Sequence, residues 1–105
     1  MSLDVNLRLV NTKTGEYRCL EDERFRGNNF TFVKDLVENM DKYGQYVPIT
    51  DEIFEYLCKH SFEKLKDEGF CDFNENCGIM GFIKLLHLRD FFAKLGYTLC
   101  VEADW

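Results

Sequence analysis

The chain has 105 residues, of which 46% are hydrophobic, 15% aromatic and 30% charged, and its formal net charge is −6. This composition excludes a disordered chain, which would contain few aromatic residues, and a collagen-like or proline-rich chain, because there is a single proline. The length fits one globular domain over residues 1–105. No apolar run reaches the roughly 18 residues of a membrane span, so we expect no membrane contact. The negative charge argues against nucleic acid, which binds cationic surfaces.

The charge is unevenly divided along the chain. Residues 1–50 contain seven Lys or Arg and eight Asp or Glu, whereas residues 51–105 contain six and eleven, giving net charges of −1 and −5. An acidic half is usually a solvated surface, but it also suits a basic partner. The five cysteines, an odd number without a secretory leader, indicate reduced thiols in a cytoplasmic protein. We expect residues 1–3 to be disordered or added for expression.

The predicted elements begin with a β-hairpin. Asp4–Val10 alternates apolar and polar residues and predicts a strand, a polar turn over 11–15 follows, and 16–20 predicts a second strand. A polar connection over 21–29 leads to an amphipathic helix over Thr31–Tyr43. Pro48 breaks the chain, and a second helix runs from residue 50 or 51 to about Glu68.

The remaining elements are an irregular stretch over 70–78, a helical segment over 79–95 and a closing strand over Tyr97–Val101. Gly44, Gly69 and Gly96 each follow a helical segment and are predicted to end it, because glycine accepts the left-handed conformation. The order β-β-α-α-α-β predicts an α+β fold. We expect a small, mostly antiparallel three-stranded sheet with the helices packed on one face, and the last strand beside one of the first two.

The segment 79–95 has two apolar faces. On a helical wheel, one side carries Ile79, Phe82, Ile83 and Leu86, and nearly the opposite side carries Leu88, Phe91, Phe92 and Leu95. The stripe therefore changes face near His87. We favour a continuous helix that is buried on both sides. A break near His87 into two helices is an alternative, and so is an interface with a partner or a second copy formed by the second side.

The best candidate for ligand binding is the stretch before the helix at residue 31. Arg24, Arg26, Asn28 and Asn29 lie there, and guanidinium groups beside a helix N-terminus suit a phosphate or carboxylate. The alternative is that the arginines pair with the acidic residues at 21–23, while the phenylalanines of this stretch hold it against the core.

Metal and thiol chemistry have weaker support. Four residues have no standard zinc spacing: Cys58, His60, Cys71 and Cys77. Asp72, Asn74 and Asn76 resemble the start of a calcium loop but lack its glycine and its bidentate glutamate. A cysteine can be activated by His60 or His87 only if the fold brings the two together. We therefore expect no metal, no cofactor and no catalytic residue.

The sequence thus favours a small acidic cytoplasmic module without catalytic activity, which binds another protein or a second copy of itself. The alternative function is a small domain, binding or enzymatic, that holds an anionic ligand in the loop from Arg24 to Asn29.

Overall fold

A computed structural model describes residues 3–18, 24–67 and 78–105 of the chain. Its elements in chain order are the strands β1 (Asp4–Asn11), β2 (Tyr17–Arg18) and β3 (Arg24–Arg26), the 3-10 helix η1 (Asn28–Phe30), the helix α1 (Thr31–Asn39), the strand β4 (Val47–Pro48), the helices α2 (Asp51–Asp67), α3 (Ile79–Leu86) and α4 (Arg89–Lys94), and the strand β5 (Tyr97–Asp104). The α+β class, the antiparallel sheet and the single compact domain are confirmed.

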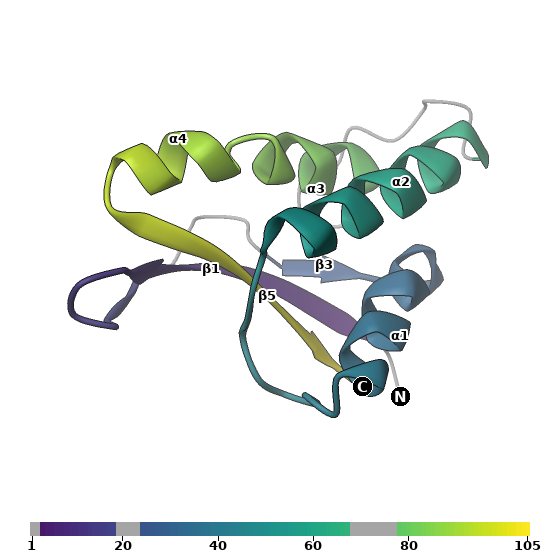
Figure 1. The fold of residues 1–105 in the computed structure, drawn as a ribbon. Coiled ribbons are helices and arrows are strands. Elements are labelled where there is room, and N and C mark those ends of the chain that lie inside the picture. Colours follow the sequence, from purple (N-terminus) through teal and green to yellow (C-terminus); the bar gives the residue numbers. More distant parts are fainter. Residues whose placement is uncertain (1–2, 19–23, 68–77) are drawn as a thin grey trace.

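The sheet is built on the long antiparallel pair of β1 and β5, whose register runs from Asp4 opposite Asp104 to Asn11 opposite Tyr97. The strand order is β2-β1-β5-β4, and β3 pairs with β1 beyond β2 on the same edge. The expected pairing of the last strand with one of the first two is therefore confirmed. The helices lie together on one face of this sheet (Figure 1).

The core lies between the sheet and the helices. Alternate residues of β1 and β5 face it, so that Val5, Leu7 and Val101 are fully buried. Phe25 of β3 and Phe30 of η1 each place a ring 5.3 Å from the ring of Phe82 in α3. These three buried aromatic rings join segments that are far apart in the sequence, and they explain why the polar stretch at 24–30 is held against the core.

Two strands that the sequence did not predict, β3 and β4, lie where we expected connections. β3 has three residues and β4 has two, and segments this short cannot show a periodic pattern by themselves. Each forms because it pairs with the edge of a long strand, β3 with β1 and β4 with β5. Pro48 is tolerated because β4 is an edge strand.

One helical boundary and the N-terminal segment differ from the prediction. α1 ends at Asn39 rather than Tyr43, since Asp41 takes the left-handed conformation (φ 57°) and the N–H of Lys42 donates to the carbonyl oxygen of Val37. Gly96 ends α4 as predicted, with φ 91°, while Gly69 lies outside the described residues. Leu3, for which we expected disorder, is buried in the core.

The continuous helix predicted over 79–95 is wrong. α3 ends at Leu86 and α4 begins at Arg89, with His87 and Leu88 between them. The break falls where the apolar stripe changes face, so that the two sets of apolar residues lie on two separate helices or at their ends.

Candidate functional site

The two helices that share the predicted segment 79–95 differ in burial. α3 buries most of its apolar residues in the core, namely Ile79, Phe82, Ile83 and Leu86, whereas α4 contains no buried residue. α4 is nevertheless packed at the end of the sheet, in contact with β5 (Figure 1). Of the three arrangements considered from the sequence, the structure combines the break near His87 with an uncovered second face.

The uncovered face consists of three large apolar side chains, which we call the α4 ridge: Leu88, Phe91 and Leu95. Their exposed fractions are 40%, 55% and 58%. Their spacing of three and four residues places them along one side of a helix. Phe92, the fourth residue of the predicted interface, is partly buried and packs against the core. Phe92 therefore attaches α4 to the protein, and the ridge faces outward.

Arg89 fixes the start of α4. Its Nη1 donates to the carbonyl oxygen of Ile49 at 3.2 Å, and its Nη2 lies 2.8 Å from Oδ1 of Asp51 at the start of α2. The guanidinium also lies over the ring of Phe54, 4.5 Å from its centroid. Its side chain is only 19% exposed. Sequence analysis missed this residue, because its partners come from segments about 40 positions away and no local pattern indicates them.

Positive side chains gather at the other end of α4. The β1–β2 hairpin meets this end through Thr12, whose N–H and hydroxyl both donate to the carbonyl oxygen of Gly96, at 3.0 and 2.7 Å. Lys13 follows Thr12 in the sequence and Lys94, the last residue of α4, lies two residues before Gly96, so these two lysines flank the contact. Arg18 lies over the ring of Tyr97, 5.8 Å from its centroid. We call Lys13, Arg18 and Lys94 the cationic end.

The cationic end carries more positive than negative charge. Among residues 9–18, the part of the hairpin near its turn, Glu16 is the one carboxylate. Asp90, at the start of α4, forms an ion pair with Arg89, whose Nη2 lies 3.4 Å from its Oδ1. No ion pair joins Lys13 or Lys94 to a carboxylate in the part of the chain that the structure describes.

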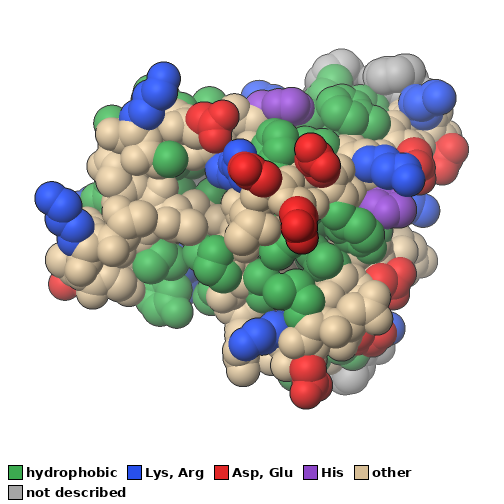
Figure 2. Space-filling view, viewed as in Figure 1, with side chains coloured by type: hydrophobic (Ala, Val, Ile, Leu, Met, Phe, Trp, Pro, Cys, Tyr) green, Lys and Arg blue, Asp and Glu red, His purple; other side chains and the backbone are tan. Residues whose placement is uncertain are grey.

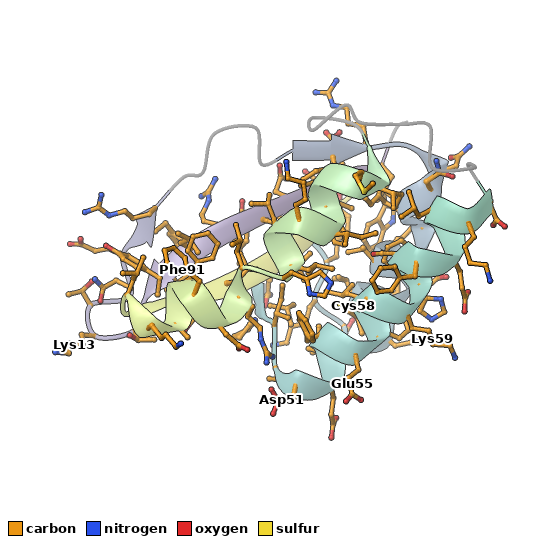
Figure 3. All side chains as sticks on the ribbon, turned by 90° about the horizontal axis from the view of Figure 1, so that it is seen from above. Lys13, Asp51, Glu55, Cys58, Lys59 and Phe91 are labelled. Atoms are coloured by element: carbon orange, nitrogen blue, oxygen red, sulfur yellow. The ribbon has the colours of Figure 1, made fainter. Side chains whose placement is uncertain are left out.

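The acidic charge lies elsewhere, along α2. Asp51, Glu52 and Glu55 are exposed in the first turns of this helix. In Figure 2 acidic side chains gather over α2, and lysine or arginine side chains stand at the end formed by α4 and the hairpin. In Figure 3 Phe91 lies on the opposite side of the helical layer from Asp51 and Glu55. The ridge is thus separated from the acidic face and adjoins the cationic end.

A cavity of about 370 Å³ lies between α4, the start of α2 and the first residues of β5. Asp51, Arg89 and Asp90 line it together with Thr50 and Thr98. Its one arginine is already bound to both carboxylates, so the cavity offers a bound anion no available guanidinium.

The predicted anion loop is partly occupied by internal contacts. Nε of Arg26 lies 3.0 Å from Oδ1 of Asp4, its partner across the sheet. Asn28 and Asn29 are exposed in η1, which has no side-chain cap. The side chain of Arg24 lies outside the described part of the structure. Arg26 is therefore paired, though with Asp4 rather than with the acidic run at 21–23, and the anion site stays a prediction.

Some of the metal and thiol candidates lie among the described residues, and the others lie outside them. Cys71, Cys77 and the residues of the calcium-like loop lie outside the described residues. Within the described ranges, no group of three or more His, Cys, Asp or Glu could hold a metal ion. Burial raises the pKa of the Cys58 and Cys100 thiols, which disfavours the reactive thiolate.

The sheet face opposite the helices carries a cluster that sequence analysis also missed. The guanidinium of Arg8 lies 4.7 Å from the ring centroid of Tyr46 and 5.4 Å from that of Tyr17. The two rings are 5.6 Å apart. The cluster unites β1, β2 and the segment before β4, and it covers part of the open face with its own side chains.

Comparison with protein-family models, with curated proteins and with solved structures finds no match to this chain. In the described part of the chain, no helix combines the length and the apolar character needed to cross a membrane. The functional argument therefore depends on the surface of the molecule itself.

Proposed function

We propose that this protein is a non-catalytic binding module that recognises another protein through the α4 ridge. The observation that carries the proposal is the exposure of Leu88, Phe91 and Leu95 on a helix that is otherwise firmly attached. Burying such a side chain fully contributes about 1.5–3 kcal/mol relative to leaving it in water. Because the ridge side chains are already about half buried, a partner that covers them gains roughly half of this free energy for each side chain.

The edges of the sheet favour binding through side chains rather than through the addition of a strand. In the described part of the sheet, both edges are formed by strands of two or three residues, and one contains Pro48. Such short edges offer little backbone for another strand to pair with. Cys58 and Cys100 form no disulfide, which suits a cytoplasmic binding protein.

The proposal is tested by affinity capture from a lysate of the cells that express the protein, followed by binding of the purified captured protein. Wild type is compared with Phe91→Ala and with Met40→Ala. Met40 is a matched control because it is an exposed apolar residue, at 37%, that belongs to the end of α1.

We expect one protein to bind wild type and Met40→Ala equally and Phe91→Ala at least about tenfold more weakly, as for an interface hot spot. The amide shifts on binding should map to residues 88–95. Equal binding by all three variants, or no specific binding by any, would overturn the proposal.

A further inference from the structure

We infer that the partner of the α4 ridge presents an apolar groove or helix face bordered by carboxylates, although the protein itself is acidic. The inference rests on the proposed function and adds the chemistry of the partner. The basis is the position of the cationic end, Lys13, Arg18 and Lys94, next to the last turn of the ridge-bearing helix.

The charge around the ridge is opposite in sign to that of the whole chain. The net charge of the chain is −6, but residues 9–18 of the hairpin contain two cations, Lys13 and Arg18, and one carboxylate, Glu16. Lys13 and Lys94 have no carboxylate within ion-pair distance in the described ranges. Exposed charges that have no ion-pair partner within the protein are available to steer and orient a binding partner.

The size of the ridge favours a different protein over a second copy. An obligate homodimer buries about 2,000–5,000 Å² in total, whereas a transient complex between different proteins buries less than about 1,200 Å², and a surface of three half-exposed side chains suits the smaller class. The short sheet edges add no surface on which strands could pair.

A lipid surface fits less well than a protein. Each Lys or Arg beside an anionic membrane contributes about 1 kcal/mol, and lipid-binding clusters typically contain about four to eight such residues. The cationic end contains only Lys13, Arg18 and Lys94, which is enough to orient a protein partner but falls below that number.

The test uses two synthetic amphipathic peptides of about five helical turns. They share one apolar stripe and differ only in their flanking residues, which are Glu in one peptide and Lys in the other. Binding to the full chain is followed by the amide shifts of residues 88–95. We expect the Glu peptide to bind at least about tenfold more tightly, and its advantage to shrink as salt rises.

Charge reversal provides the matched control. Lys13→Glu combined with Lys94→Glu should abolish the preference for the Glu peptide. Lys59→Glu combined with Lys66→Glu changes the net charge equally, but both residues are exposed on α2, so the preference should persist. Figure 3 shows Lys59 at the opposite end of the molecule from Lys13.

The outcomes separate this inference from the proposed function. Equal affinity for the two peptides, with Phe91→Ala weakening both, overturns the acidic partner but leaves the ridge as a binding surface. No shift in α4 with either peptide overturns both. A dimer in light scattering that Phe91→Ala dissociates assigns the ridge to a second copy. Tighter binding to phosphatidylserine vesicles than to the Glu peptide assigns it to a lipid surface. Each of these last two results overturns the inference.

Discussion

Replacing Arg89 by alanine should destabilise the protein far more than replacing the carboxylate to which it is bound. The ion pair with Asp51 is weak, because the side chain of Asp51 is 93% exposed, and exposed pairs contribute at most about 1 kcal/mol. The bond to the carbonyl oxygen of Ile49 and the contact with the Phe54 ring each add roughly 1 kcal/mol. Arg89→Ala should therefore lower the free energy of unfolding by about 2–3 kcal/mol, and Asp51→Asn by about 1 kcal/mol or less.

Urea unfolding followed by the fluorescence of Trp105, the one tryptophan, measures both changes. Arg89→Lys provides the matched control, since it keeps the charge but loses the planar group that reaches two acceptors. Its free energy of unfolding should lie between those of wild type and Arg89→Ala. Hydrogen exchange should also accelerate in residues 89–95 more than in β5 when Arg89 is replaced. Equal losses from Arg89→Ala and Asp51→Asn would refute the reasoning, because the exposed ion pair would then account for the whole effect.

Three other predictions concern the fold. Ser61 is fully buried and its Oγ has no hydrogen-bond partner in the described structure, so Ser61→Ala should raise the free energy of unfolding by about 1 kcal/mol; a loss in urea unfolding would contradict this. Gly96 has φ 91° and no atom within 4 Å of an added Cβ, so Gly96→Ala should cost about 1–2 kcal/mol through backbone strain alone, and a cost below about 0.5 kcal/mol would contradict it. The Tyr43 hydroxyl donates to Asp104 at 2.9 Å, and this hydrogen bond raises the pKa of Tyr43 above its usual value of 10.0. Because the folded pKa is the higher one, the stabilisation is present below pH 10 and is lost as the pH rises through the folded pKa. The stability difference between wild type and Tyr43→Phe should therefore narrow from pH 8 to pH 11, and a difference that stays constant over this range would contradict the raised pKa of Tyr43.

The parts of the fold that the sequence predicts are those with enough residues to show a period. β1 has eight residues that alternate between core and open face, and the inward residues Val5, Leu7 and Leu9 are all buried. β3 and β4 have three and two residues, so their pairing depends on the edges of β1 and β5 and not on their own pattern. The end of α1 depends on Asp41, whose left-handed conformation is accessible to aspartate but is not required by it.

The α4 ridge is visible in the sequence only as a change of apolar face at His87. That change is compatible with a helix buried on both sides, with a break and with an interface, because the pattern shows which residues share a side but not what covers them. The structure covers Phe92 and leaves Leu88, Phe91 and Leu95 exposed. The arrangement follows from Arg89, which holds the start of α4 against Ile49 and Asp51, contacts that no local motif indicates.

The charge of the binding surface depends on the fold in the same way. Along the chain, the half that contains α4 has a net charge of −5, and this count alone favours a basic partner. In space, the bonds from Thr12 to Gly96 carry Lys13 from the near-neutral half to the end of α4, while the carboxylates of α2 lie on the other side of the helical layer. Since opposed charges act mainly within about 10 Å in physiological salt, a protein bound to the ridge would respond to these neighbouring cations more than to the total charge. An acidic protein can therefore present a cationic surface, and the acidic partner that we propose follows from the hairpin's position beside α4.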